Sequence, residues 1–244
     1  MSTEPLLAAM PHPNGGSVPM ADDPTSASIA GMSTTSVTQS PPDIAIDVVL
    51  RDGSTVHVRP VAADDVSAIH AFFDRLSLES IGLRFFGMPS LDWVTRWAVD
   101  VDYADRYALV ATTGPEHTIV AHGAYIRIDA DRAEVAFVVT DAWQGHGIAT
   151  ILLGELAAVA KEHGIVVFKA EVLPYNHRMI EVFRDSGFPV QLQRGEGVIE
   201  VEFPTSLSDE ALQHFERHEH ASDAQWFTAA DWSLSPLPGE GRTG

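Results

Sequence analysis

The chain has 244 residues, of which 45% are hydrophobic and 20% charged, and its formal net charge is −19 at pH 7. A surface this acidic repels phosphate groups, so binding to nucleic acid or to an anionic membrane is not expected, and cationic partners are favoured. Cysteine is absent, which excludes disulfides, cysteine–metal sites and a cysteine nucleophile. There is no 18-residue apolar run and no signal-peptide pattern at the start, so we expect a cytoplasmic protein.

Three segments differ in composition. Residues 1–43 are rich in Ser, Thr, Pro, Ala and Gly, and we expect them to be disordered because they cannot bury enough surface to offset their ordering entropy. Residues 44–204 carry regular apolar patterns and form the one predicted domain. Residues 205–244 are predicted to hold a polar helix at 209–220 and a flexible tail.

The apolar patterns within the domain predict an α/β fold. A hairpin around Asp52-Gly53 comes first, followed by helices, an antiparallel meander with short loops, and a further run of helices and strands. In chain order the elements are expected at 48–51, 55–61, 64–76, 79–86, 91–99, 107–113, 118–128, 132–140, 147–163, 165–173, 176–187, 190–193 and 198–203. The strand at 165–173 is predicted to be buried.

A short loop rich in small residues joins the strand at 132–140 to the helix at 147–163. Gly145 and Gly147 let a ligand approach the backbone, whose N–H groups lie at the positive end of the helix dipole. This favours an anion site of the kind that holds a pyrophosphate, although the two glycines also fit a plain tight turn. No Lys follows the loop and G-x-G-x-x-G is absent, so the nucleotide-binding loops with those patterns are excluded.

The residues Gln144-x-x-Gly147-x-Ala149 match the (Gln/Arg)-x-x-Gly-x-(Gly/Ala) signature of the GNAT acyltransferase superfamily, which the chain resembles over residues 48–204. The resemblance implies the GNAT fold, a mixed and mostly antiparallel sheet flanked by helices, in which the fourth and fifth strands splay apart. Here those strands are 132–140 and 165–173. Features that resemble the Pat-type bacterial protein lysine acetyltransferases, including those fused to ADP-forming acyl-CoA synthetases, are Arg51-Asp52-Gly53, Arg59-Pro60, Ser80 and Leu83-Arg84-Phe85-Phe86-Gly87.

The resemblance implies that acetyl-CoA binds between the splayed strands and that no metal is involved. The residues implied in binding are Phe137, Val138 and Val139 for the pantetheine arm, Gln144, Gly145, His146, Gly147, Ile148, Ala149 and Thr150 for the pyrophosphate, and Asn176 and Arg178 at the start of the next helix. Arg178 would reach the adenosine end. His146 and Arg178 are also compatible with ordinary exposed positions.

Acetyl transfer needs a neutral amine, and a lysine with a pKa near 10.4 is deprotonated in only about 1 in 2,500 molecules at pH 7. Glu134 matches the general-base Glu of the Pat-type branch and would take the proton directly or through a water. Its position also fits an ordinary solvent-facing strand glutamate. The oxyanion is expected on a strand amide, that of Val138. Phe183 stands where many GNAT enzymes carry a tyrosine as general acid, which leaves the existence of such an acid open.

The expected function is acetyl-CoA-dependent N-acetylation of a protein lysine, and the resemblance implies an acyl-CoA synthetase as a candidate partner. Two alternatives stay open. One is acetylation of a small cationic amine such as a polyamine or an aminoglycoside, which the net charge fits equally well, and the other is a catalytically silent acyl-CoA sensor. Acyl length and oligomeric state are not predicted. Of the chain's two lysines, Lys161 is expected to be the main internal target, because Lys169 falls in the strand predicted to be buried.

Overall fold

The computed structural model describes residues 45–206, so the predicted segment 1–43, the predicted helix at 209–220 and the tail lie outside the described residues. The strands are β1 (Ile46–Val49), β2 (Thr55–Pro60), β3 (Arg106–Thr113), β4 (Thr118–Arg127), β5 (Arg132–Val139), β6 (Val167–Val172), β7 (Gln191–Arg194) and β8 (Ile199–Pro204). The helices are α1 (Val66–Asp74), α2 (Leu78–Phe85), α3 (Leu91–Val99), α4 (Ile148–Glu162) and α5 (His177–Arg184). Single 3-10 turns precede α1 and follow β5.

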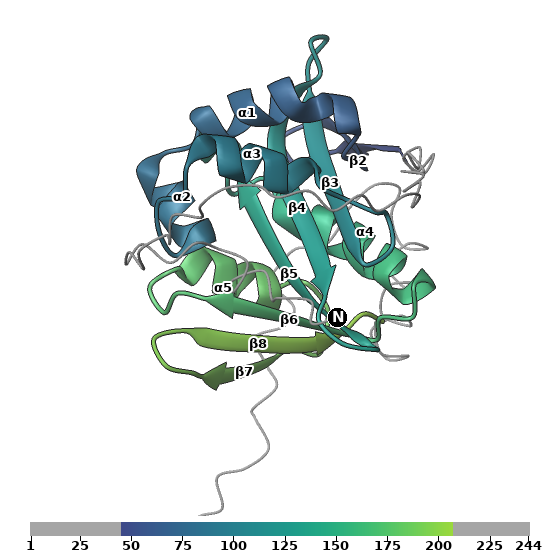
Figure 1. The fold of residues 1–244 in the computed structure, drawn as a ribbon, viewed down its shortest axis with the longest axis vertical. Helices are drawn as coiled ribbons and strands as arrows, with labels where there is room; N and C mark the ends of the chain where they lie inside the picture. The colour runs from purple at the N-terminus through teal and green to yellow at the C-terminus, as the bar shows by residue number, and fades with distance from the viewer. Residues whose placement is uncertain (1–44, 207–244) are drawn as a thin grey trace, which may run out of the picture.

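The eight strands form one sheet in the order β1-β2-β3-β4-β5-β6-β8-β7 (Figure 1). Every neighbouring pair is antiparallel except β5 and β6, which are parallel. This is the mixed, mostly antiparallel α/β sheet that the sequence predicted. The helices begin and end within one or two residues of their predicted bounds, except that α5 ends at Arg184 rather than at Gly187. The Ser186 hydroxyl donates to the Phe183 carbonyl at 2.6 Å, and this bond replaces a further helical turn.

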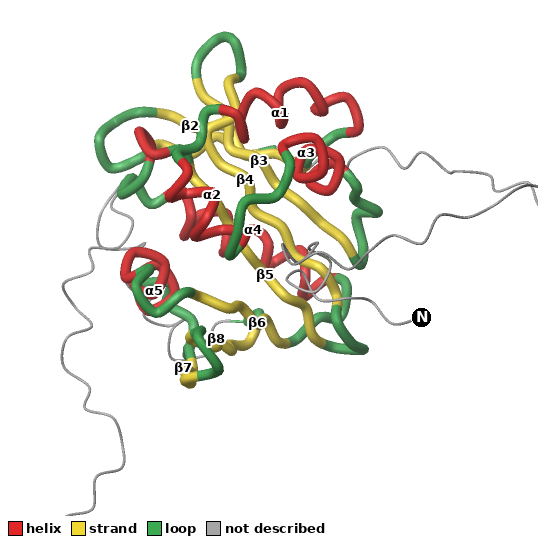
Figure 2. The backbone as a smooth tube through the Cα atoms, turned by 60° about the vertical axis from the view of Figure 1, so that its left-hand side comes forward, coloured by secondary structure: helices red, strands yellow, loops and turns green. Residues whose placement is uncertain are grey.

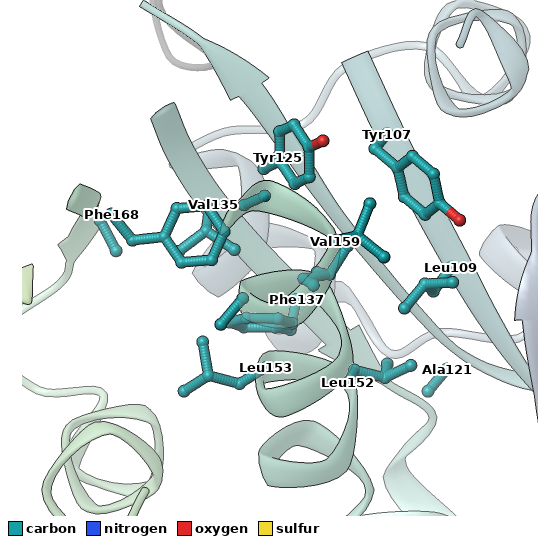
Figure 3. Packing of buried hydrophobic residues seen from close by; sticks show 14 of the residues in the cluster. Tyr107, Leu109, Ala121, Tyr125, Val135, Phe137, Leu152, Leu153, Val159 and Phe168 are labelled. Atoms are coloured by element: carbon teal, nitrogen blue, oxygen red, sulfur yellow. The ribbon is translucent and has the colours of Figure 1, made fainter. Parts of the chain in front are cut away.

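Two cores lie on opposite faces of the sheet. The α4 face contains the larger core, in which Phe137, Leu152, Leu153 and Val159 pack together below Tyr107 and Tyr125 (Figure 3). Helices α1, α2 and α3 cover the other face of the central strands and enclose the second core. Helix α5 lies on the α4 side, since its buried Phe183 belongs to the larger core. One face of β5 therefore packs against α4, and its other face lies toward α1, α2 and α3.

Strands β5 and β6 pair over only three positions, the last of which joins Glu134 to Lys169. Beyond that pair β5 continues to Val139 and β6 to Val172 without further pairing, and the two strands run apart (Figure 2). The splay between the family's fourth and fifth strands is therefore present in this chain as β5 and β6. No strand of residues 45–206 pairs with this edge of β5 over its last five residues.

The end of β2 is tied to the start of α1 by an ion pair between Arg59 and Asp65. Both guanidinium Nη atoms donate to the Asp65 carboxylate at 2.7 Å, and the Ala62 amide donates to it at 2.8 Å. Burial opposes the charged form, but the bonds from Arg59 and Ala62 outweigh it and lower the pKa of Asp65. The pair fixes the entry into the helical layer over the sheet.

We expect Asp65→Ala to lower the free energy of unfolding at pH 7 by about 2–3 kcal/mol, because it leaves a half-buried guanidinium without its partner. Since the pKa of Asp65 is lowered in the folded state, this contribution is present above its ordinary value of 3.8 and is lost as the pH falls through the folded value. Urea unfolding at pH 7 and pH 3 measures both effects. If Asp65→Ala is less stable than the wild type by the same amount at both pH values, the Asp65 carboxylate does not stabilise the fold through this ion pair.

Candidate functional site

The loop between β5 and α4 offers backbone N–H groups at the wide end of the splay. Gly145 and Gly147 have φ of +82° and +84°, values that favour glycine, and no atom of the described residues lies within 4 Å of a Cβ placed at either position. Ile148 and Ala149 bury their side chains, and Thr150 is half-buried. Within residues 45–206, no hydrogen-bond acceptor is found for the amides of Gly145, His146, Gly147, Ile148, Ala149 and Thr150. The loop therefore has the donors and the open space that an anion such as a pyrophosphate needs.

The Gln144 side chain connects β5, α2 and α5. Its Nε2 donates to the Val139 carbonyl and to the Ser80 hydroxyl, both at 3.2 Å, and its Oε1 accepts from Arg178 Nη1 at 2.7 Å. Because Ser80 belongs to α2 and Arg178 to α5, the network joins the two sides of the splay at the loop. Arg178 thus lies beside the loop, and Asn176 caps α5 by accepting from the Met179 amide at 3.2 Å.

Asp141 holds the same loop against α2 and was not among the predicted site residues. Its carboxylate accepts from the Ser77 amide at 3.1 Å, from the Ser77 hydroxyl at 2.8 Å and from the Ser80 hydroxyl at 3.0 Å. Burial raises its pKa, but these bonds outweigh that effect and lower it below its usual range. A serine at the start of a predicted helix indicates a cap, yet nothing in the sequence connects it to a carboxylate 64 residues away.

His146 contacts the turn of the β1–β2 hairpin. Its Nε2 lies 3.3 Å from Asp52 Oδ2, and its Nδ1 lies 3.1 Å from the Gln144 carbonyl. Hydrogen bonds from Ser54 are the main cause of the lowered pKa of Asp52, and the charge of His146 adds to it. The side chain therefore carries a packing contact within the loop, and whether it also reaches a phosphate stays a prediction.

The unpaired edge of β5 presents backbone groups of alternate residues to the splay. The Thr140 amide donates to Val120 at one end of the β4–β5 ladder, and the Ile128 amide donates to Arg132 at the other. With the register between them, these bonds turn the backbone of Val138 toward β4 and the backbones of Phe137 and Val139 toward the splay. The expected use of the Val138 amide for an oxyanion does not fit this pairing, and the amides of Phe137 and Val139 point the right way.

Glu134 lies on the face of β5 that α1–α3 cover, at the last pair before the splay. Arg84, on α2, faces it across this layer. Its guanidinium lies 4.7 Å from the centre of the Phe85 ring and 5.4 Å from that of Trp97, and its Nε and Nη2 find no hydrogen-bond partner in the described part of the chain. Burial lowers the pKa of Arg84 to about 10, and the charge of Glu134 opposes that shift. Arg84 belongs to the segment that resembles the Pat-type enzymes in sequence, but its nearness to Glu134 follows only from the fold.

His122, on β4, completes the buried polar group of this face. The ring is fully buried near Phe73 and Trp97, and within residues 45–206 neither nitrogen has a partner in full hydrogen-bond geometry, although the Ala98 backbone interacts with the ring. Burial lowers the pKa of His122 to about 3, and the charge of Arg84 adds to that shift. The imidazole is therefore neutral in the folded protein at every pH near 7.

We expect His122→Leu to be neutral or stabilising at pH 7, because it removes two buried nitrogens that have no partner in full hydrogen-bond geometry among the described residues. The unfolded imidazole takes a proton below its ordinary pKa of 6.5, whereas the folded one does so only near 3, so the wild type loses stability as the pH falls between these values. The free energy of unfolding of the variant should therefore rise relative to that of the wild type by up to about 1.4 kcal/mol for each pH unit below 6.5. Urea unfolding of both proteins at pH 7, 5.5 and 4.5 checks this. A difference in free energy of unfolding that stays constant over these pH values would contradict it.

The position predicted for a general acid holds a core side chain. The Phe183 ring is buried, with its centre 6.3 Å from that of Phe137 and 5.6 Å from that of Phe203. The Tyr125 hydroxyl is buried and donates to the Ala104 carbonyl at 2.9 Å, and Tyr175 lies exposed between β6 and α5. Neither Phe183 nor Tyr125 can therefore give a proton to a leaving group in the splay.

Lys169 is not buried, contrary to the prediction. The side chains of Phe168, Ala170 and Val172 point into the α4 core, whereas that of Lys169 lies on the opposite face and is 40% exposed. Its Nζ lies 3.3 Å from Glu202 Oε2 on β8. The apolar run around it suggested a strand buried on both faces, but β6 is covered on one.

Residues 45–206 bring no three His, Cys, Asp or Glu side chains together in the way a metal site requires. None of the helices in this part of the chain has the length and apolar character needed to cross a membrane.

Comparison with known proteins identifies the family. Residues 78–188 match the model of the Acetyltransferase (GNAT) family. Acetyltransferase Pat of Mycolicibacterium smegmatis is 34% identical over 167 residues, which cover 65% of this chain and 49% of that protein. The chain therefore spans about half the length of this curated relative.

Solved structures agree in fold. The GNAT domain of S. lividans PAT is 42% identical with a TM-score of 0.61, and the match covers 66% of this chain and 96% of that domain. The structure of yncA from Salmonella typhimurium with its cofactor acetyl-CoA has a TM-score of 0.50 at 17% identity, over 63% of this chain and 95% of that one, and is alike in fold alone. The chain therefore belongs to the GNAT family of acetyltransferases, and within it is similar to the GNAT domain of Pat-type proteins.

Proposed function

We propose that the chain transfers the acetyl group of acetyl-CoA to the ε-amine of a protein lysine, with Glu134 as general base and residues 44–204 as the catalytic domain. One observation carries the proposal. The splay of β5 and β6, the open amides of the loop from Gly145 to Thr150 and the carboxylate of Glu134 lie along one strand and the helix that follows it. A phosphorylated donor and an amine can meet there.

The residues present fit acetyl-CoA, the acyl donor that the GNAT family uses. The loop amides would hold its pyrophosphate, because they are open donors at the start of α4. The outward backbone groups of Phe137 and Val139 would pair with the pantetheine arm. Arg178 and Asn176, at the start of α5, flank the same opening from the other side, and Gln144 holds Arg178 in place. When bound, the donor supplies a thioester carbonyl that an amine can attack.

Glu134 would remove the proton that keeps a lysine from reacting. Only about 1 in 2,500 lysine side chains is neutral at pH 7, which adds roughly 4.6 kcal/mol to the barrier. A carboxylate within reach of the amine, or one water away, relieves most of that cost. The developing oxyanion would be held by the Phe137 or Val139 amide. A general acid is not needed at Phe183, because thiols have a pKa near 8.5 and leave readily as thiolates.

The acceptor is proposed from the Pat-type relationship and from charge. A formal net charge of −19 attracts cationic acceptors, and an acyl-CoA synthetase lysine is the protein acceptor that we propose. Charge alone favours polyamines and aminoglycosides equally, so they enter the test as competitors. Because the attraction is electrostatic, acceptor KM should rise with salt.

Thiol release from acetyl-CoA, followed with protein and small-amine acceptors in parallel, tests the proposal. We expect release to depend on a protein acceptor and to be lost in Glu134→Gln. Release with spermidine or an aminoglycoside, but not with protein, would replace the protein acceptor by a small amine. Binding of acetyl-CoA by calorimetry without release for any acceptor would make the chain an acyl-CoA sensor.

A further inference from the structure

Lys169 occupies a position beside the proposed base that the sequence did not reveal. It is the direct partner of Glu134 in the parallel β5–β6 register. Side chains of directly paired residues point to the same face of a sheet, and here the buried neighbours Ala133, Val135, Phe168 and Ala170 occupy the other face. The amine of Lys169 and the carboxylate of Glu134 therefore emerge side by side.

The same pair marks the point where the splay begins. It is the last paired position of the two strands, so both side chains stand at its narrow end. Under the proposed function, the pyrophosphate is held at the wide end and the pantetheine arm runs along Phe137 and Val139 toward Glu134. The acyl end of the donor is then directed to the place from which Lys169 extends.

The amine of Lys169 is free to leave its present contact. Its ion pair with Glu202 is part-exposed, at 40% and 44% exposure of the two side chains, and such pairs contribute about 0–1 kcal/mol. Arg132 Nη1 lies 3.8 Å from the same Glu202 oxygen. Glu202 therefore keeps a cationic neighbour when the lysine turns away, so the movement costs little.

We propose that Lys169 is an acetylation site of this chain, modified in cis by its own active centre; this rests on the proposed function. The ε-ammonium gives one proton to Glu134, and the nitrogen lone pair attacks the thioester carbonyl. The C–N bond forms as the C–S bond breaks, the thiol leaves as a thiolate, and the second nitrogen proton passes to solvent. The product is a neutral amide that no longer pairs with Glu202.

The chain contains its own control. Lys161 is the only other lysine in the sequence, and it is exposed on the last turn of α4, the helix that covers the opposite face of the sheet. Both amines meet the same acetyl-CoA concentration in one tube. Any difference in labelling therefore reports position and not the chemical reactivity of acetyl-CoA.

The test incubates the full chain with acetyl-CoA and no acceptor, and follows intact mass and peptide mapping over time. We expect one acetyl group at Lys169, added at least about tenfold faster than at Lys161. The rate per molecule should not change when the protein is diluted tenfold at constant acetyl-CoA, since the transfer is intramolecular. Lys169→Arg should remove the label, Lys161→Arg should leave it, and Glu134→Gln should slow it by roughly 10²-fold or more.

Four results would overturn the inference. Three of them are equal labelling of the two lysines, labelling of Lys169 that persists in Glu134→Gln, and a rate per molecule that falls in proportion to dilution of the protein. The fourth, absence of label at Lys169 while an external acceptor is acetylated, would leave the proposed function standing. Absence of both, with no thiol release, would instead contradict the proposed function.

Discussion

Replacement of Glu134 by glutamine should lower kcat at pH 7 by roughly 10²–10⁴ while the Kd for acetyl-CoA stays nearly unchanged. The amide keeps the shape of the side chain but cannot accept the proton of the acceptor lysine. The loss should shrink at pH 10, where roughly a quarter of lysine side chains are already neutral. Initial rates at the two pH values, with calorimetry for the cofactor, measure both effects.

Glu171 provides the matched control for this variant. It lies on β6 two residues beyond Lys169, on the same face, and is exposed. Glu171→Gln removes an equal charge from the same surface and leaves the proposed base in place. Its kcat should therefore stay within about twofold of the wild-type value, because the effect of Glu134→Gln comes from the base and not from the change in surface charge. Equal losses at pH 7 and pH 10 in Glu134→Gln would point to a structural role for Glu134.

Replacement of Gly147 by valine should raise the Kd for acetyl-CoA at least tenfold, or about 1.4 kcal/mol. The residue has φ +84°, which a β-branched side chain adopts only under strain, and the space in front of it is where the pyrophosphate would lie. The added atoms would occupy that space and move the loop amides. Calorimetric titration of the folded variant gives the change in Kd.

Gly197 separates ligand effects from backbone strain. It has φ +82°, and no atom of residues 45–206 lies within 4 Å of a Cβ placed there. It lies in the β7–β8 hairpin, away from the loop. Gly197→Val should lower the melting temperature by an amount similar to Gly147→Val and leave the Kd unchanged. An unchanged Kd in a folded Gly147→Val protein would remove the pyrophosphate from this loop.

The sequence predicted the fold well because its signals were local. Alternating apolar residues with short turns indicated the meander, and the apolar stripe after Gly147 indicated α4. The resemblance to the GNAT family then implied the splay between the strands that are β5 and β6, and the strand pairing shows it.

The features that were missed depend on pairing between distant segments. Whether Val138 or its neighbours turn their amides outward is decided by the register with β4, which no local pattern reveals. Lys169 was predicted to be buried because its neighbours are apolar, yet its exposure follows from which face of β6 is covered. The approach of Arg84 to Glu134 likewise requires α2 to lie over β5.

Mass spectrometry of an acceptor protein tests most directly whether this site acetylates a protein lysine. An acetyl-CoA synthetase from the same organism is incubated with the chain and acetyl-CoA, mapped for modified lysines and assayed for its own activity. We expect one acetylated lysine, loss of synthetase activity, and neither change with Glu134→Gln. No modified lysine in the synthetase, while spermidine or an aminoglycoside is acetylated rapidly, would contradict the claim.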